Sequence, residues 1–269
     1  MTLPRSALLA AWAGAVAAGR ARTADALLAV AGEDEPHMVD PAPGFTAPAS
    51  LPVPDPGYLS DLLVLLGAAG EGSPVHVRCV LPAPGDVLGV PGPAGLRAAA
   101  VDAGECVVVE GLADGSGGRT ALALVPEVEE FGPAGDVGVH VRWQAWHAEP
   151  VPGSPLATSV AEADMAFRLA LGEATTDLES LQLSSWRPDA TAGLRGRGGV
   201  AQQPLPPTLG PRSLRLLDRA EKVMAILAVA EGDHGGAVTG WEAGRRSASL
   251  AELSRATRAA VAAAVSLPG

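Results

Sequence analysis

The chain has 269 residues, of which 48% are apolar and only 3% aromatic, and its formal net charge is −11. A chain of this length buries enough surface to fold without disulfide bonds or a structural metal ion. No window approaches the roughly 18 strongly apolar residues that a membrane span requires, so we expect no transmembrane helix. The bias toward Ala, Gly, Pro, Arg and Val, with Lys222 as the one lysine, is typical of a GC-rich bacterial genome.

The charge is distributed unevenly along the chain. Residues 1–184 hold 8 basic and 23 acidic side chains, a net charge of −15, whereas residues 185–269 hold 11 basic and 7 acidic, a net charge of +4. Duplex nucleic acid is repelled by the whole chain and only weakly attracted to its C-terminal part. The composition therefore does not favour a nucleic-acid-binding protein.

The N-terminal segment, residues 5–31, predicts two short helices or one kinked helix that ends near Gly32. Arg5 and the apolar run after it superficially resemble a secretory signal. However, the run is dominated by alanine, Gly14 interrupts it, and the pattern continues without a break through residues 23–28. We therefore expect this segment to be structural and the protein to be cytoplasmic.

Residues 40–56 contain six prolines, which exclude a helix or a central strand there. Asp55 and Pro56 then have the residue types of an N-cap and a first helical position, and predict a helix to about residue 69. A second irregular connection, rich in Gly, Pro and Gln, covers residues 184–211.

The middle of the chain predicts the sheet. Alternating or continuous apolar runs indicate four strands, at about 75–81, 105–111, 119–128 and 136–147. A short helix, opened by Gly92 and Pro93 and closed by Gly104, separates the first two. We therefore expect an α+β fold with a small four-stranded mixed or antiparallel sheet packed with several helices.

The C-terminal part predicts helices. Ser159 and Glu162 fit a capping box. The apolar stripe that follows predicts one long amphipathic helix, with a buried face formed by Val160, Ala163, Phe167, Leu171, Ala174, Leu178 and Leu181. A helix over 214–230 and two closing helices, begun by capping boxes at Thr239 and Ser249, complete the chain. We expect a single α+β domain over 1–269, with a possible subdivision into a sheet-containing part, 1–150, and a helical part, 151–269.

No motif for catalysis, cofactor binding or metal binding is present. The chain lacks the glycine-rich phosphate loops, the GxSxG elbow and the HExxH pair. Cys79 and Cys106 lie in apolar, strand-like runs, so we expect two buried free thiols rather than a disulfide. They lack the paired histidines of a zinc site. We therefore expect no cofactor, no metal and no catalytic residue.

Two candidate sites remain. The Pro/Gly loop 82–93 joins a strand to a helix, where backbone N–H groups favour an anion, and Arg97 supplies a nearby cation. The other candidate is a surface on the outer faces of two strands, which would be contiguous if these strands were neighbours. Its residues are His76, Arg78, His140, Arg142 and Trp146.

The hypothesis favoured by the sequence is a non-enzymatic binding or scaffolding protein that forms a homodimer. Its contact surface would be the His/Arg/Trp sheet face or the long helix after Ser159. The alternative is a protein that binds a small anionic molecule, or an enzyme, that uses loop 82–93 and Arg97. The sequence identifies neither the ligand nor the protein partner.

Overall fold

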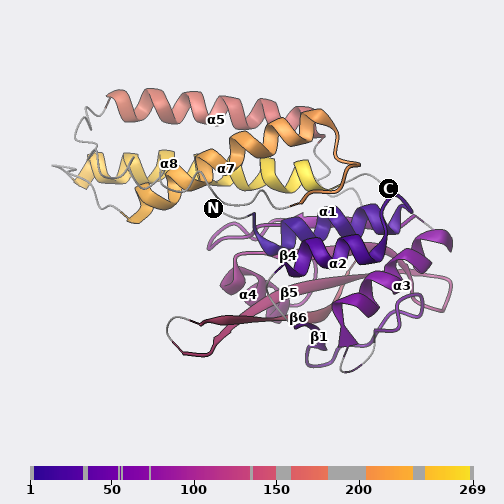
Figure 1. The fold of residues 1–269 in the computed structure, drawn as a ribbon. Coiled ribbons are helices and arrows are strands. Elements are labelled where there is room, and N and C mark those ends of the chain that lie inside the picture. Colours follow the sequence, from indigo (N-terminus) through magenta and orange to yellow (C-terminus); the bar gives the residue numbers. More distant parts are fainter. Residues whose placement is uncertain are drawn as a thin grey trace. The chain divides into compact units, whose positions relative to one another are not determined.

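The computed structural model describes residues 3–32, 36–53, 55, 57–72, 74–133, 136–149, 159–180, 204–232 and 240–266. In these ranges the fold is α+β, with a six-stranded mixed sheet, seven helices and a helical C-terminal part (Figure 1). No helix among these residues is long and apolar enough to cross a membrane. The chain divides into two compact units, which are described separately below.

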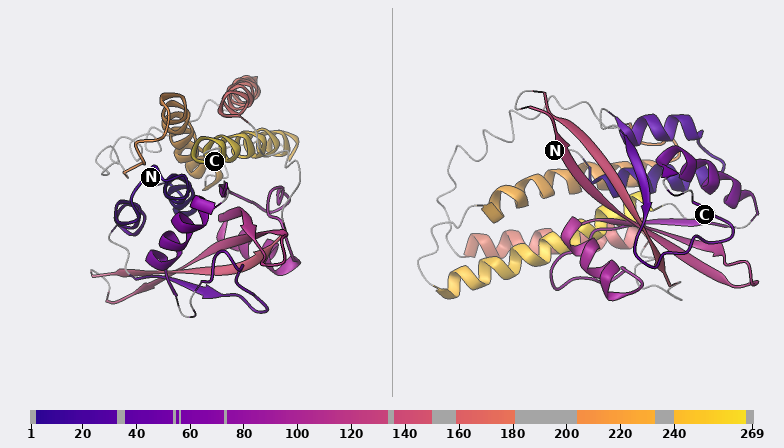
Figure 2. Two further views of the ribbon diagram at one scale, coloured as in Figure 1. Left: turned by 90° about the vertical axis from the view of Figure 1, so that its right-hand side faces the viewer. Right: turned by 90° about the horizontal axis from the view of Figure 1, so that it is seen from below.

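The first unit, called the sheet unit, comprises residues 4–157, 204–210 and 265–269. Its sheet has the strand order β2-β1-β6-β5-β4-β3, and all neighbours are antiparallel except the parallel pair β1–β6. The strands are β1 (His37–Pro41), β2 (Gly57–Tyr58), β3 (His76–Val80), β4 (Cys106–Ala113), β5 (Arg119–Phe131) and β6 (Gly138–Ala148). The four predicted strands are confirmed, and Figure 2 shows the strong twist of the sheet that they form with β1 and β2.

Strand β1 corrects the prediction that residues 40–56 exclude a central strand, because it extends to Pro41. It lies between β2 and β6, and its last two residues are Asp40 and Pro41. Proline is tolerated there because β2 pairs only with Met38 and Val39, so the N–H that Pro41 lacks is not needed for that ladder.

Four helices belong to this unit: α1 (Arg5–Ala17), α2 (Thr23–Ala31), α3 (Leu59–Gly72) and α4 (Ala94–Ala103). The N-terminal pair and the helix closed by Gly104 are confirmed. The predicted start of α3 at Pro56 is wrong, because Gly57 and Tyr58 form β2 and the helix begins at Leu59. The Asp61 carboxylate accepts the Tyr58 N–H there, at 3.1 Å.

The core lies on both faces of the sheet. Alternate residues of β4 and β5, including Val108 and Ala123, pack with Leu96 and Ala100 of α4 in one apolar cluster. The intervening residues, such as Val109 and Leu122, point to the opposite face, where α1 packs. Residues 6–17 of α1 are all buried, so this alanine-rich helix is a core element of the unit.

The second unit, called the helical unit, comprises residues 1–3, 158–203 and 211–264. Its helices are α5 (Val160–Ser180), α7 (Pro211–Gly232) and α8 (Gly240–Val265), of which Val265 alone belongs to the sheet unit. The capping box at the start of α5 is confirmed by three hydrogen bonds between Ser159 and Glu162.

The prediction of two closing helices is wrong, because α8 is continuous over 26 residues. Ser249 lies inside it, and its hydroxyl donates to Asp177 of α5 at 2.7 Å instead of capping a new helix. Most of the predicted connection 184–211, namely residues 184–203, lies outside the described residues.

Candidate functional site

The strands that carry the predicted His/Arg/Trp surface are not neighbours. β4 and β5 lie between β3, which carries His76 and Arg78, and β6, which carries the other three residues. Arg78 and Trp146 do lie on the same face of the sheet and opposite each other across the strands. Arg78 pairs with Val108, Val108 pairs with Ala123, and Ala123 pairs with Trp146. Three strand spacings put the backbones of Arg78 and Trp146 about 14 Å apart. The structure therefore places these five residues on one face without bringing them together.

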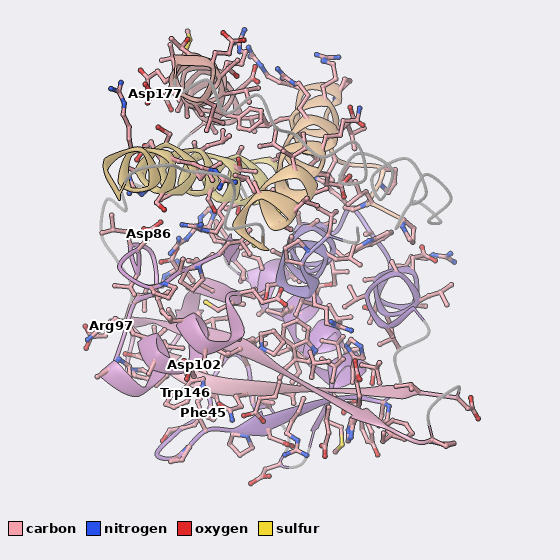
Figure 3. All side chains as sticks on the ribbon, turned by 90° about the vertical axis from the view of Figure 1, so that its left-hand side faces the viewer. Phe45, Asp86, Arg97, Asp102, Trp146 and Asp177 are labelled. Atoms are coloured by element: carbon pink, nitrogen blue, oxygen red, sulfur yellow. The ribbon has the colours of Figure 1, made fainter. Side chains whose placement is uncertain are left out.

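Helix α4 covers the space between the two groups. Leu96 and Ala100 are fully buried against Val108 and Ala123, and the Trp146 ring packs at the edge of the same cluster. Gly95 makes the close approach possible, since a Cβ there would lie 3.1 Å from Cζ3 of Trp146. Figure 3 shows Trp146 beside this helix and Arg97 pointing outward from it.

Both strand arginines have acidic partners. Arg78 donates to both carboxylate oxygens of Glu110 at 3.0 Å, and both side chains are less than one-fifth exposed. Arg142, by contrast, is 43% exposed, with Nε 3.2 Å from Asp40 and Nη2 3.8 Å from Glu129. Arg142 therefore belongs to an accessible charged surface, whereas Arg78 has a structural ion pair.

The predicted anion site is a tight loop. Ala83 and Asp86 exchange backbone hydrogen bonds at 3.0 and 2.8 Å, which close a small turn. Arg97 is exposed and donates to the carbonyl of Gly92, at the end of the same loop. A role of Arg97 in binding an anion stays a prediction.

The two cysteines are free and buried, on opposite faces of adjacent strands. Burial raises the pKa of the Cys106 thiol to about 12 and raises the pKa of Cys79 as well. Neither thiol is therefore available as a thiolate nucleophile near neutral pH. No group of three or more His, Cys, Asp or Glu side chains in the described ranges is arranged to hold a metal ion.

A partly buried carboxylate lies at the start of α1. Glu105 Oε2 accepts the backbone N–H of Ser6 at 2.7 Å and satisfies one of the free donors of that helix end. Burial raises the pKa of Glu105, although the bonds from Ser6 and the charge of Arg5 oppose that effect. The group is a structural contact between α1 and the start of β4.

The predicted strand at about 119–128 covers most of β5 but not its last three residues, 129–131. Strand β4 pairs with β5 only as far as Leu124, yet β5 continues to Phe131, and the ladder with β6 continues to the pair Phe131–Gly138. Residues 127–131 are all exposed. We call residues 127–131 and 138–142 the arm. The run of glutamates after Pro126 was the available sequence signal.

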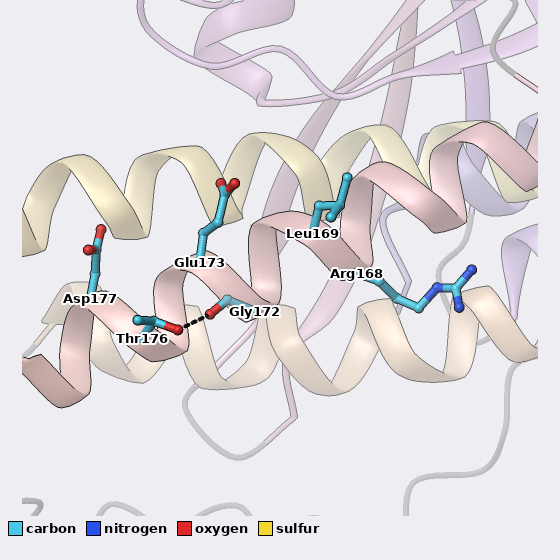
Figure 4. A pocket seen from close by; sticks show the side chains of 6 residues that line it. All are labelled: Arg168, Leu169, Gly172, Glu173, Thr176 and Asp177. Atoms are coloured by element: carbon cyan, nitrogen blue, oxygen red, sulfur yellow. Dashed lines mark hydrogen bonds between the residues drawn. The ribbon is translucent and has the colours of Figure 1, made fainter.

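The sequence prediction missed a second apolar stripe on α5. The predicted stripe is confirmed at Ala163, Phe167 and Ala174, which are buried. On the opposite side, Met165 and Leu169 are 56% and 59% exposed. Leu169 borders a surface hollow of about 520 Å³, which is lined by Arg168, Leu169, Gly172, Glu173, Thr176 and Asp177 (Figure 4).

Charged contacts hold α5 to the other two helices of its unit. Asp164 lies 2.6 Å from Arg219 of α7, and Asp177 lies 2.9 Å from Arg245 of α8. Hydrogen bonds from Ser249 and Arg245 hold the pKa of Asp177 below its usual range. These contacts fix which side of α5 faces its neighbours.

The two units differ sharply in charge. The sheet unit holds 7 basic and 18 acidic side chains, a net charge of −11, whereas the helical unit holds 12 of each and is neutral. The whole net charge of the protein is therefore carried by the sheet unit.

The chain is an α+β protein that belongs to the Rv1486c-like family. Residues 6–157 match the N-terminal domain of the Rv1486c-like protein family, and residues 161–262 match its C-terminal domain.

Its relatives include mycobacterial proteins. The uncharacterized protein Rv1486c of Mycobacterium tuberculosis is 30% identical over 244 residues, covering 84% of this chain and 83% of that protein. The uncharacterized protein ML1804 of Mycobacterium leprae is 29% identical over 257 residues, covering 84% of each chain. No solved structure matches the chain.

Proposed function

We propose that this protein is a non-enzymatic binding or scaffolding protein that works as a homodimer and captures an extended, basic segment of a protein partner. The observation that carries the proposal is the open edge of β5, which continues past Leu124, its last residue paired with β4, to Phe131. A segment of the partner would add there as a further strand.

The backbone of the arm supports strand addition. On this side β5 has no partner strand beyond residue 124 in the described sheet, while β6 pairs with its other side. In an antiparallel strand, alternate residues direct their N–H and C=O groups to the same side. These groups form a row of unpaired donors and acceptors, which is what strand addition uses for affinity.

The side chains of the arm select the kind of partner. Glu127, Glu129 and Phe131 lie on one face of β5, and Val128 and Glu130 on the other. A second copy of the same edge would place glutamates opposite glutamates, which is unfavourable. A segment that alternates basic and apolar residues meets complementary neighbours instead, and the net charge of −11 on the sheet unit attracts it.

Part of the predicted sheet-face surface belongs to this site. His140 pairs with Glu129 in the β5–β6 ladder, and Arg142 lies near the same glutamate. Both are on the face of the sheet that carries Glu127. In a homodimer the two arms would act together on a partner with repeated basic segments, which raises the overall affinity.

The test uses the full chain and a capped ten-residue peptide of alternating Lys and Val, labelled for fluorescence anisotropy. The control peptide has the same side chains but is N-methylated at every residue, so it lacks N–H donors for pairing on both of its edges. We expect binding of the first peptide and at least about tenfold weaker binding of the second. Equal affinity for both would reject strand addition.

A further inference from the structure

Helix α5 has a second apolar face that its own unit leaves exposed. Met165, Leu169, Gly172 and Thr176 recur at spacings of four, three and four, which is the a/d spacing of a two-helix seam. At about 100° per residue, this stripe points away from the buried face of Phe167 by roughly 180°. We call these four residues the seam.

The seam combines an apolar projection with a depression. Leu169 is 59% exposed beside the hollow of about 520 Å³ that Gly172 helps to line. Nothing lies within 4 Å of the position where a Cβ on Gly172 would be. A leucine of another helix can therefore enter this space, as a side chain does in knobs-into-holes packing.

We infer that the seam of α5 pairs in parallel with the seam of α5 in a second copy of this chain. The charges on the two flanks of the seam are complementary to each other, which favours a second copy of the same helix as the partner. Arg168 lies on one flank and Glu173 on the other, as Figure 4 shows. The Arg168 side chain is 55% exposed, although it also contacts Asp164 at 3.3 Å.

In a parallel pair about a two-fold axis, the Arg168 flank of one helix faces the Glu173 flank of the other. Symmetry then gives two Arg168–Glu173 pairs between the copies. In an antiparallel pair, like flanks face each other, and Glu173 meets Glu173 of the second copy. The charge pattern therefore selects the parallel orientation.

Glu162 and Glu179 end the apolar part of the seam, which spans about 17 Å from Met165 to Thr176. So short a helical contact is at the low end of specific interfaces, and the dimer dissociates on dilution. This inference rests on the homodimer of the proposed function and specifies its surface and orientation.

The test is disulfide crosslinking of the full-length variant Gly172→Cys under mild oxidation, since a parallel pair brings this position close to its copy. Lys222→Cys, at an exposed position of α7, is the matched control. We expect a covalent dimer for the first variant and not for the second, and we expect Leu169→Glu to abolish it. Cys79 and Cys106 are buried and do not compete.

Sedimentation velocity over a range of concentrations separates the two proposals. A wild-type dimer that Leu169→Glu disrupts, while Leu214→Glu on α7 leaves it intact, supports the α5 seam. A wild-type dimer unaffected by Leu169→Glu, without crosslinking at position 172, overturns the seam but keeps the homodimer. A wild-type monomer at every concentration overturns both.

Discussion

The guanidinium of Arg78 lies 3.0 Å from each carboxylate oxygen of Glu110, which makes a two-point ion pair between β3 and β4. The two side chains are 12% and 18% exposed. A pair with this geometry gains two charge-assisted hydrogen bonds and is specific to arginine.

The first prediction concerns this pair. Arg78→Ala should lower the free energy of unfolding in urea by about 3 kcal/mol, because it leaves the Glu110 carboxylate largely buried without a partner. The double change Arg78→Met with Glu110→Leu should cost less than the single change. A double variant as unstable as the sum of its single changes would contradict this explanation.

The second prediction concerns the buried contact between β1 and β6. Trp143 is fully buried, and its Nε1–H donates to Nδ1 of His37 at 3.2 Å. His37→Phe removes this acceptor and should lower the free energy of unfolding by about 1–3 kcal/mol. His147→Phe, at an exposed position of β6, is the control and should leave it nearly unchanged. Equal losses in both variants would show that the hydrogen bond is not the cause.

The third prediction concerns pH. The folded state raises the pKa of Glu105, so it favours the protonated carboxyl more than the unfolded chain does. The contribution of Glu105 to stability is therefore present below its unfolded pKa of about 4.3 and is lost as the pH rises through the folded value.

Glu105→Gln should accordingly be more stable than wild type at about pH 7, and the difference should shrink toward about pH 4. Urea denaturation at both values measures it, with the exposed Glu71→Gln as the control. A variant less stable than wild type at neutral pH would mean that the bond to Ser6 outweighs the cost of burial.

The sequence predicted the four central strands because each is an apolar run bounded by glycine or proline, as Gly104 and Gly132 show. It missed β1 and β2, which are short. β1 has two apolar residues before Asp40 and Pro41, and its partner β6 lies about a hundred residues away. Only tertiary pairing distinguishes such a segment from a loop.

Helix ends were predictable where a local signal decided them, as at Ser159 and Gly104. Ser249 shows the limit of that reasoning, because the same capping-box residues can lie inside a helix when a neighbour offers another partner. Here Asp177 of α5 accepts the Ser249 hydroxyl bond. The sequence could not reveal that contact.

The candidate sites depended on strand order, which the sequence does not contain. Alternation placed His76 with Arg78 on one strand and His140 with Arg142 on another, but two strands separate the two groups. The open edge of β5 exists because β4 begins pairing only opposite Leu124. The residues of the α5 seam have a regular spacing in the sequence, but the stripe through Phe167 is more apolar and was therefore predicted as the buried face.

The fourth prediction tests the charge of the arm. The double change Glu127→Lys with Glu129→Lys, two residues on the same face of β5, should weaken binding of the Lys/Val peptide by about tenfold, because two attractive cross-strand neighbours become repulsive. Glu71→Lys with Asp102→Lys changes the net charge equally at exposed positions outside the arm. If both double variants lose affinity equally, net charge alone attracts the peptide.

Hydrogen exchange of the backbone amides of residues 127–131, with and without the Lys/Val peptide, tests the proposed function most directly. The open edge of β5 predicts that amides of this segment directed away from β6 exchange more slowly when the peptide is bound, and that amides of α3 do not change. Binding that leaves every amide of residues 127–131 unprotected would contradict strand addition at this edge.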